Sequence, residues 1–317
     1  MRHLFVMDPL DRIHVSGDST YVVMCAACER GDAVAWCTPD RMFVLNGEAR
    51  ATVTFGAVVR TAPPFRPEET IEVDLGSFDV VWMRKDPPFD MTYILSTYLL
   101  DLIPAPTLVV NDPVGLKRFN EKIWAMHFAR FQPPTLMSRD LAKLRAFVEA
   151  QPAGAVLKPW DGNGGRGIVM TGKGDRNLPA LLELMTANGV DYAIAQAFIP
   201  GVSKGDKRIL IFDGEPVGAV LRVPGESDHR ANLHVGGKAV ACELDADDLA
   251  ICAALGPELK AHGQIFVGID VIAGKLTEIN VTSPTGLQEY ARLTGVHLEH
   301  RLVETVARLA QAKRARS

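Results

Sequence analysis

Short apolar runs alternate with longer segments of helical periodicity through the first third of the chain. The runs predict strands at residues 3–7, 33–36, 80–84 and 107–110, and the longer segments predict helices at residues 19–30 and 92–102. Two further runs, at residues 42–45 and 48–55, flank Asn46-Gly47, a dipeptide that suits the positive φ angles of a type I′ hairpin turn. Alternation of strands with helices predicts a parallel sheet whose strands are joined by crossover helices.

The pattern changes at about residue 120. Beyond it, helices are expected at residues 121–130, 140–150, 178–188, 245–262 and 297–312, and strands at residues 155–158, 168–171 and 192–196. Two pairs of strands follow, at residues 207–212 with 215–222 and at residues 266–272 with 275–280. Each pair is joined by a two-residue turn, Asp213-Gly214 or Ala273-Gly274, which predicts an antiparallel hairpin.

The composition is that of an ordinary globular protein, and it narrows the class of function. The 317 residues are 47% hydrophobic with a formal net charge of -4, and the length predicts two or three domains. The chain lacks the basic stripe of a nucleic-acid-binding protein, and no apolar run approaches the ~20 residues that span a bilayer. Five scattered cysteines indicate a reduced, cytoplasmic protein. Cys25 and Cys28 lie in an apolar helical stretch, which favours buried thiols over a redox or zinc motif.

The first candidate site is a lysine followed by four glycines within nine residues. Lys158 ends a predicted strand, and the glycines are Gly162, Gly164, Gly165 and Gly167. Glycine lets consecutive N–H groups line a concave nest for phosphate oxygens, and the lysine adds a positive charge. The lysine precedes the glycines and the loop joins strand to strand, so this is neither a P-loop nor a dinucleotide-binding fingerprint. A flexible surface hairpin is the alternative, and the loop alone leaves both open.

The second candidate site lies on the predicted hairpin at residues 266–280. Glu278 and Asn280 are two apart on one strand and therefore share a face, and the tight turn brings Asp270 opposite them. Three oxygen-bearing side chains on an otherwise apolar hairpin suit Mg²⁺, which takes carboxylates together with substrate phosphates. A polar stripe that faces solvent is the alternative. The neighbouring Val, Ile and Leu residues favour a buried strand, where carboxylates without partners would be costly.

The third candidate is a group of arginines, which bind carboxylates and phosphates through two parallel hydrogen bonds. Arg84 ends a predicted strand, at the edge where ligands bind in doubly wound sheets. Arg208 and Arg222 fall on the paired strands around Asp213-Gly214, and Arg230 follows them. Each arginine alone would be expected to form a surface ion pair, so the combination carries the argument.

Together these residues resemble the signature of the ATP-grasp ligases. Lys122 within Asn120-Glu121-Lys122, Lys158 before its glycine loop, and Asp270 with Glu278-x-Asn280 carry this resemblance. Four further stretches resemble the bacterial glutathione synthetases in particular, in family order along nearly the whole chain. They are Val6-Met7-Asp8-Pro9, Met83-Arg84-Lys85-Asp86-Pro87-Pro88-Phe89-Asp90, Gly205-Asp206-Lys207-Arg208, and Glu278-Ile279-Asn280-Val281-Thr282-Ser283-Pro284-Thr285.

The resemblance implies an α/β architecture with the ATP-grasp fold. It implies an N-terminal Rossmann-like α/β domain at residues 1–120, a small lid domain at residues 121–198, and a C-terminal α+β domain at residues 199–317, with ATP between the last two. It also implies ligation of γ-glutamylcysteine to glycine through an acyl phosphate, with ATP converted to ADP and phosphate, in a cytoplasmic homotetramer. Two Mg²⁺ ions are implied, with Mn²⁺ as a possible substitute. The partners implied are these small molecules, with no nucleic acid and no membrane.

The resemblance also implies a role for each candidate residue. The nucleotide would be bound by Lys122, Lys158, Gly164, Gly165, Gln196, Phe198 and Ile199. The peptide and amine substrates would be bound by Asp18, Arg84, Arg230, Asn232, Ser283 and Thr285. Arg208 and Arg222 would face the reacting end as catalytic residues, and Asp270, Glu278 and Asn280 would hold the metal ions.

Departures from the family pattern keep other functions open. Ala197 stands where a polar residue is frequent, Arg166 stands where smaller residues are usual, and the end of the acceptor region, residues 286–290, differs from the family forms. An ATP-grasp ligase with a different amine acceptor is therefore the main alternative. An ATP-binding protein without catalysis and a redox role for Cys25 and Cys28 are more distant ones.

Overall fold

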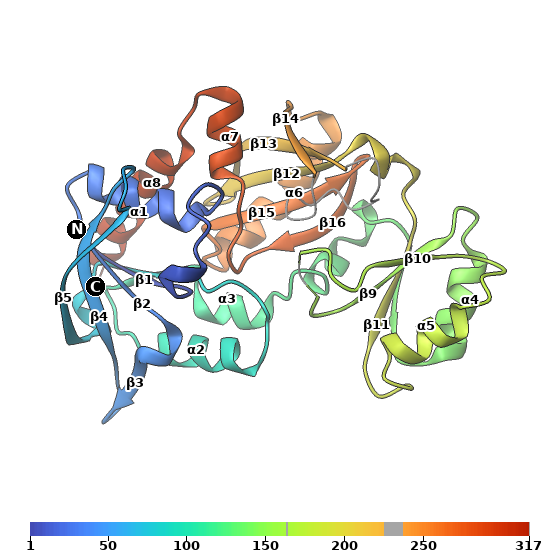
Figure 1. Cartoon of the computed structure of the whole chain (residues 1–317), viewed down its shortest axis with the longest axis horizontal. Helices are drawn as coiled ribbons and strands as arrows, with labels where there is room; N and C mark the ends of the chain where they lie inside the picture. The colour runs from blue at the N-terminus through green and yellow to red at the C-terminus, as the bar shows by residue number, and fades with distance from the viewer. Residues whose placement is uncertain (163, 225–236, 317) are drawn as a thin grey trace.

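The computed structural model of the chain describes residues 1–162, 164–224 and 237–316, and arranges their strands in three sheets (Figure 1). The first sheet has the order β3-β4-β2-β1-β6-β7, with β5 paired to β4. Its parallel half consists of β1 (Arg2–Val6), β2 (Ala33–Cys37), β6 (Val80–Met83) and β7 (Leu108–Val110). Its antiparallel half consists of β3 (Met42–Leu45), β4 (Glu48–Val58) and β5 (Phe65–Asp74).

The predicted parallel sheet is thus only half of the observed one. Strand β5 could not be predicted from the sequence. Most of its residues are exposed and three are glutamates, so apolar and polar residues do not alternate along its whole length. The hairpin between β3 and β4 is present as predicted, with positive φ at Asn46 and Gly47.

Helices cover both faces of the parallel strands, which explains why β1 is apolar at consecutive positions. Phe5 and its neighbour Met7 pack toward α1 (Ser19–Glu29) and α8 (Leu298–Arg314). Leu4 and Val6 belong to the other core, with residues of α2 (Met91–Asp101) and α3 (Pro113–Arg118). Figure 1 shows the two helix layers on opposite sides of the sheet.

The second sheet is antiparallel and lies at one end of the molecule (Figure 1). It has the order β10 (Val169–Thr171), β9 (Ala155–Pro159), β11 (Ala193–Ala197) and β8 (Thr135–Ser138). Helices α4 (Leu141–Ala150) and α5 (Leu178–Met185) cover it, and Leu144, Leu157 and Leu182 are central to a small core of its own.

The chain enters this sheet through a segment that differs from the predicted helix at residues 121–130. It is a 3₁₀ helix, Trp124–Phe131, interrupted at Phe128, where φ is -106° and ψ is 41°. Aromatic residues are weak helix formers, and Trp124 stacks on Phe119 at a ring distance of 3.8 Å. Tertiary packing of these rings therefore overrides the helical period.

The third sheet has the order β14 (Lys238–Ala241), β13 (Glu215–Val223), β12 (Asp206–Phe212), β15 (Phe266–Ile272) and β16 (Lys275–Asn280), all antiparallel. The two predicted hairpins are confirmed, with positive φ at Asp213, Gly214, Ala273 and Gly274. Helix α6 (Ala246–Ala261) begins at a capping box formed by Asp245 and Asp248. Helix α7 (Leu287–Thr294) follows β16 and leads into α8.

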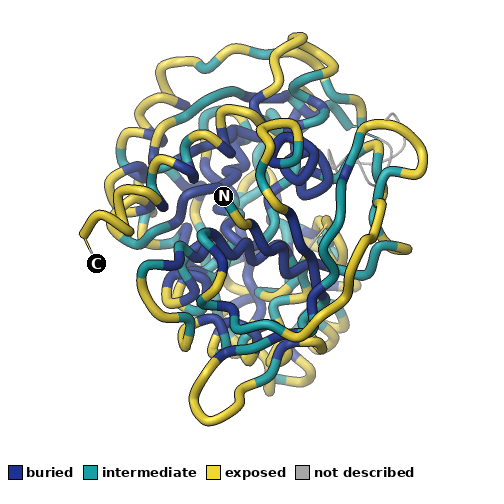
Figure 2. Tube along the Cα trace, turned by 90° about the vertical axis from the view of Figure 1, so that its left-hand side faces the viewer, coloured by how far each residue is buried: buried dark blue, intermediate teal, exposed yellow. Residues whose placement is uncertain are grey.

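The first and third sheets pack against each other, because each of the two larger hydrophobic cores contains side chains from both sheets. The buried part of the trace runs continuously through this region (Figure 2). Asn111, 3% exposed, joins the two sheets directly. Its amide donates to the carbonyls of Phe266 and Val281 at 2.8 and 2.7 Å and accepts from the N–H groups of Ile265 and Phe266, both at 2.8 Å.

The cysteines match the interpretation as free thiols. Cys25 is buried and Cys28 partly buried, and Cys28 accepts a hydrogen bond from the N–H of Val58. Burial raises the pKa of the Cys25 thiol to about 11, which keeps it protonated. None of the helices among the described residues is long and apolar enough to cross a bilayer.

Candidate active site

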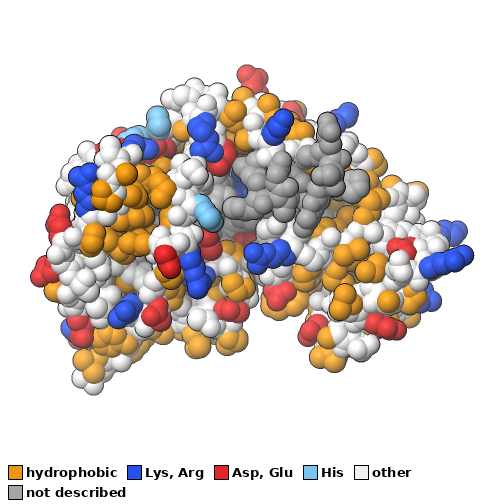
Figure 3. Space-filling view, in the orientation of Figure 1, with side chains coloured by type: hydrophobic (Ala, Val, Ile, Leu, Met, Phe, Trp, Pro, Cys, Tyr) orange, Lys and Arg blue, Asp and Glu red, His pale blue; other side chains and the backbone are white. Residues whose placement is uncertain are grey.

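A cavity of about 660 Å³ lies between the second and third sheets, and its lining holds most of the residues that the sequence singles out. From the second sheet come Lys158, Gly164, Gly165, Gln196, Phe198 and Ile199. From the third sheet and the turn after it come Arg208, Arg222, Asp270, Glu278, Asn280, Ser283 and Thr285. In the space-filling view the molecule is hollowed between its two parts, with basic side chains beside the hollow (Figure 3).

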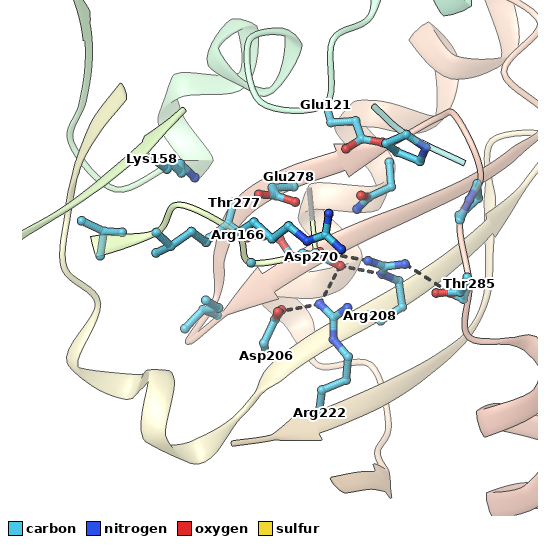
Figure 4. A pocket seen from close by; sticks show the side chains of 18 of the residues that line it. Glu121, Lys158, Arg166, Asp206, Arg208, Arg222, Asp270, Thr277, Glu278 and Thr285 are labelled. Atoms are coloured by element: carbon cyan, nitrogen blue, oxygen red, sulfur yellow. Dashed lines mark hydrogen bonds and ion pairs between the residues drawn. The ribbon is translucent and has the colours of Figure 1, made fainter. Parts of the chain in front are cut away.

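Asp270 is the centre of a buried charge network on the third sheet (Figure 4). It lies opposite Arg208 in the strand register, and Arg208 donates to it through Nε at 2.6 Å and Nη2 at 3.1 Å. Arg222, from β13, approaches the same carboxylate at 3.0 Å and donates to Asp206 at 2.5 Å. Despite burial, the two arginines hold the pKa of Asp270 well below its usual range. Asp270 is therefore ionised at any physiological pH.

A glycine beside this network is needed for space. A Cβ at Gly268 would lie 3.0 Å from Cδ of Arg208 and 3.1 Å from Cβ of Pro284. Arg208 also donates to the carbonyl of Thr285 at 3.2 Å, so its guanidinium is fixed at both ends. Two carboxylates, two guanidiniums and a close backbone thus define one rigid polar wall.

Glu278 and Asn280 share a face of β16, as the spacing predicts. Glu278 pairs directly with Asp270 in the register and Asn280 pairs with Gly268. Nζ of Lys122 lies 3.4 Å from the Glu278 carboxylate and donates to the carbonyl of Gly162. The buried side-chain nitrogen of Asn280 has no hydrogen-bond partner in the described part of the chain.

These three side chains fit a hard divalent cation. Asp270 accepts three hydrogen bonds where a carboxylate has about four lone-pair sites, which leaves one on Oδ2. Glu278 is 23% exposed toward the cavity, and an amide of Asn280 without a partner can turn its oxygen to a ligand. Oxygen ligands of this kind, completed by phosphate oxygens, are those that Mg²⁺ prefers.

The opposite wall carries the lysine and the glycine loop. Lys158 is buried and donates to Oε1 of Gln196 at 3.1 Å, and Gln196 in turn donates to Thr135 at 2.9 Å. Burial lowers the pKa of Lys158, and the cavity carboxylates act against that effect. The Lys158 side chain is thus held by a neutral amide. It lines the cavity, and no carboxylate contact among the described residues cancels its charge.

The segment from Gln196 to Ile199 forms the edge of the cavity at the end of β11. The N–H of Ala197 donates to the carbonyl of Pro134 at 2.8 Å, and that of Phe198 donates to Gly154 at 3.0 Å. Recognition of a flat base by this segment would therefore rest on its remaining backbone groups and on the apolar faces of Phe198 and Ile199.

Two predicted substrate-binding residues lie behind the cavity wall. Arg84 is buried, donates to Thr20 and to the carbonyl of Pro284, each at 3.0 Å, and is absent from the cavity lining described above. Asp18 caps helix α1 by accepting from the N–H of Tyr21 at 2.7 Å. Both residues shape the wall in this structure. Arg230 and Asn232, two other predicted residues, lie outside the described residues.

The cavity also contains residues that sequence analysis did not select. Polar and charged examples are Arg12, His14, Glu121, Arg166, Asp206 and Thr277. Glu121 and Asp206 neighbour the motif lysines Lys122 and Lys207, so proximity to a motif is a signal that could have found them. Arg12 and His14 come from the loop before α1, which carries no local pattern.

Glu121 has an unusual environment for a carboxyl group. Burial, reinforced by the negative charge of Glu278, raises the pKa of Glu121 to about 7. Oγ1 of Thr282 donates to it at 2.8 Å, and its backbone carbonyl accepts from the N–H of Ile279 at 2.9 Å. Glu121 thereby ties the entry to the second sheet to β16, beside Lys122.

The fold and the site together define an ATP-grasp ligase. The D-cycloserine synthetase DcsG superposes with a TM-score of 0.68 at 16% identity, over 97% of this chain and 99% of that chain. The ATP-grasp ligase PsnB complexed with a minimal precursor superposes with a TM-score of 0.65 at 17% identity, over 96% and 98%. Likeness at this level of identity establishes the fold.

The family follows from sequence similarity. Residues 1–117 match the N-terminal domain of prokaryotic glutathione synthetase, and residues 121–295 match its ATP-grasp domain. The chain is 43% identical over 310 residues to the glutathione synthetase of Rhodopseudomonas palustris, covering 98% of this chain and 97% of that protein. It is 44% identical over 316 residues to that of Parasynechococcus marenigrum, covering 98% and 100%. The chain belongs to the prokaryotic glutathione synthetase family.

Proposed function

We propose that this protein joins γ-glutamylcysteine to glycine while ATP is converted to ADP and phosphate. The arrangement that carries the proposal is the cavity between the second and third sheets, where Lys158 and two arginines line the same space as a pair of carboxylates, with Lys122 beside Glu278. Such a site suits an anionic nucleotide and an anionic peptide at once. Similarity to glutathione synthetases over nearly the full length supplies the identity of the substrates.

The nucleotide would lie between the second and third sheets. Lys122 and Lys158 would hold its phosphates, with Gly164 and Gly165 closing over them, and Gln196, Phe198 and Ile199 would meet the adenine. Lys158 supports this role because, within the described residues, its hydrogen-bond partner is the neutral Gln196, so its charge is left to pair with a phosphate. Residues 121–198 would act as the lid domain, residues 1–120 as the N-terminal domain and residues 199–317 as the metal and substrate domain.

Two Mg²⁺ ions would be held by Asp270, Glu278 and Asn280, and Mn²⁺ could replace them. When bound, the ions neutralise charge on the phosphates. Asp270 keeps its negative charge because Arg208 and Arg222 lower its pKa. The same arginines hold its position, so the ligand geometry is fixed before any cation arrives.

The reaction would begin with an attack by the cysteinyl carboxylate on the γ-phosphorus of ATP. A bond forms between a carboxylate oxygen and phosphorus, the bond to the bridging oxygen breaks, and ADP leaves. The amine nitrogen of glycine then attacks the acyl carbon, inorganic phosphate leaves, and the nitrogen gives up a proton. Arg208 and Arg222 would stabilise the negative charge that develops on the acyl phosphate. No side-chain nucleophile is required in this sequence of steps.

The peptide and the amine would bind along the turn after β16. Ser283 and Thr285 line the cavity there and would contact them directly. By family resemblance Arg230 and Asn232 would also bind these substrates, and Asp18 and Arg84 would act from behind the cavity wall. Arg84 supports this because it donates a hydrogen bond to the carbonyl of Pro284, which lies between Ser283 and Thr285 in the chain. By family resemblance the protein would work as a cytoplasmic homotetramer, which light scattering after gel filtration can test.

The proposal is tested with a coupled assay of ADP release. ATP, Mg²⁺ and γ-glutamylcysteine are held fixed while glycine is compared with a panel of other amines. Turnover that depends on glycine, with glutathione identified by mass spectrometry, is expected. Turnover with another amine in preference to glycine would instead establish a ligase with a different acceptor. ATP binding without turnover on any amine would leave a nucleotide-binding protein that lacks catalysis.

A further inference from the structure

Arg166 is a cavity residue that the proposed mechanism does not use. It lies in the loop between β9 and β10, between Gly165 and Gly167, whose φ angles are 77° and 70°. Backbone in this left-handed region reverses the chain direction within a few residues. Gly167 also packs on Pro159, since a Cβ there would lie 3.2 Å from its ring. The loop therefore presents Arg166 to the cavity from a defined turn.

The charge of Arg166 has no carboxylate partner among the described residues. Arg166 is exposed, and its guanidinium makes no hydrogen bond or ion pair with residues 1–162, 164–224 or 237–316. Arg208 and Arg222, by contrast, are both engaged with Asp270. An arginine that faces a cavity without a carboxylate partner is available to an incoming anion.

The direction of the side chain shows where that anion would lie. Figure 4 shows Arg166 reaching from the loop side past Glu278 toward Asp270 and Arg208. Both guanidinium groups line the same cavity, and that of Arg208 is directed at Asp270. Asp270 already neutralises Arg208, so of these two arginines Arg166 is the one whose charge is left for an incoming anion. The site between them adjoins the carboxylates proposed to hold the metal ions, at the reacting end of the nucleotide.

We propose that Arg166 is a catalytic residue that contacts the phosphoryl group during its transfer from ATP to the substrate carboxylate. This inference rests on the proposed function. Arg166 donates hydrogen bonds to the non-bridging oxygens on the side facing the loop, opposite Arg208. It transfers no proton and forms no covalent bond. As the bond from phosphorus to ADP breaks and the bond to the carboxylate forms, its charge offsets the charge that spreads over those oxygens.

Arginine suits this role better than a lysine. Its planar guanidinium can hold two oxygens at once and stays charged in any environment. Because the guanidinium of Arg166 makes no hydrogen bond or ion pair with the described residues, replacing it removes no such interaction from the folded state. A loss of activity on substitution would therefore reflect the reaction.

The test compares Arg166→Ala, Arg166→Lys and a control, Arg176→Ala. Arg176 is also exposed and follows β10, but it does not line the cavity, so the control removes the same charge from the same sheet. For Arg166→Ala we expect kcat of ADP release to fall about 100-fold, as when one donor to a developing charge is lost. KM for ATP should change little, Arg166→Lys should retain part of kcat, and Arg176→Ala should match the wild type.

A binding measurement separates this role from general nucleotide contact. Calorimetry compares the affinity for MgADP alone with the affinity for MgADP plus fluoroaluminate, which imitates the phosphoryl group in transfer. Arg166→Ala should lose affinity only for the second. Equal loss for both ligands, or a kcat equal to that of the wild type, overturns the assignment. If the wild type fails to use γ-glutamylcysteine and glycine, the proposed function fails, and the fluoroaluminate comparison still decides the role of Arg166.

Discussion

Replacement of Asn111 by alanine tests how the first and third sheets are held together. The Asn111 side chain makes four hydrogen bonds of 2.7–2.8 Å, two as donor and two as acceptor, and all its polar capacity is used. Each such bond contributes about 1 kcal/mol net, so Asn111→Ala should lower the free energy of unfolding by about 4 kcal/mol. The substitution leaves the backbone groups of Ile265, Phe266 and Val281 without these four bonds.

Urea unfolding followed by tryptophan fluorescence measures this loss. The control is Asn177→Ala, because Asn177 is exposed and its side chain makes no capping hydrogen bond at the start of α5. The control should remain within about 0.5 kcal/mol of the wild type, as is usual for surface sites. A similarly small loss for Asn111→Ala would refute the reasoning, because water or a local shift would then satisfy the freed groups without cost.

Three further substitutions test the site and its scaffold. Arg208→Lys cannot reproduce the two-point contact with Asp270, so kcat should fall about 100-fold while circular dichroism stays unchanged; an active variant would exclude a catalytic role. Glu278→Gln removes a carboxylate from the proposed metal site and should raise the Mg²⁺ concentration for half-maximal rate by about tenfold or more, and an unchanged Mg²⁺ dependence would contradict that site. Asp32→Asn should cost about 2 kcal/mol of stability at neutral pH, because Asp32 accepts charged hydrogen bonds from the N-terminal amine and Arg30.

The last prediction has a defined dependence on pH. Burial by itself raises the pKa of Asp32. Hydrogen bonds from His3, Arg30 and the N-terminal amine outweigh burial, so the pKa in the folded protein lies below its usual range. The stabilisation is therefore complete above the unfolded pKa of about 3.9 and is lost as the pH falls toward the folded value. The difference in stability between the wild type and Asp32→Asn should shrink in acid, and a difference that stays constant down to the acid transition would contradict it.

Local chemistry determined a large part of this protein. The hairpins at Asn46-Gly47, Asp213-Gly214 and Ala273-Gly274 follow from residues that tolerate positive φ, which is a property of the turn itself. The two-residue turn sets Ile272 opposite Lys275, and that register would continue to Asp270 opposite Thr277. A bulge between Asp270 and Val271 instead places Asp270 opposite Glu278, so the structure and not the turn decided this pairing. The glycine loop after Lys158 was recognisable because glycine also tolerates positive φ.

Only the tertiary structure decided which of the remaining residues meet. Arg222 reaches Asp270 because β12 lies between β13 and β15, an order of distant strands that no local pattern encodes. Packing of separate segments placed Arg84 behind the cavity wall and Arg166 within the cavity, although both looked alike as arginines beside a motif. The sequence alone determined the turns and the charges available. Long-range packing decided which charges are neutralised inside the protein and which are left to bind a ligand.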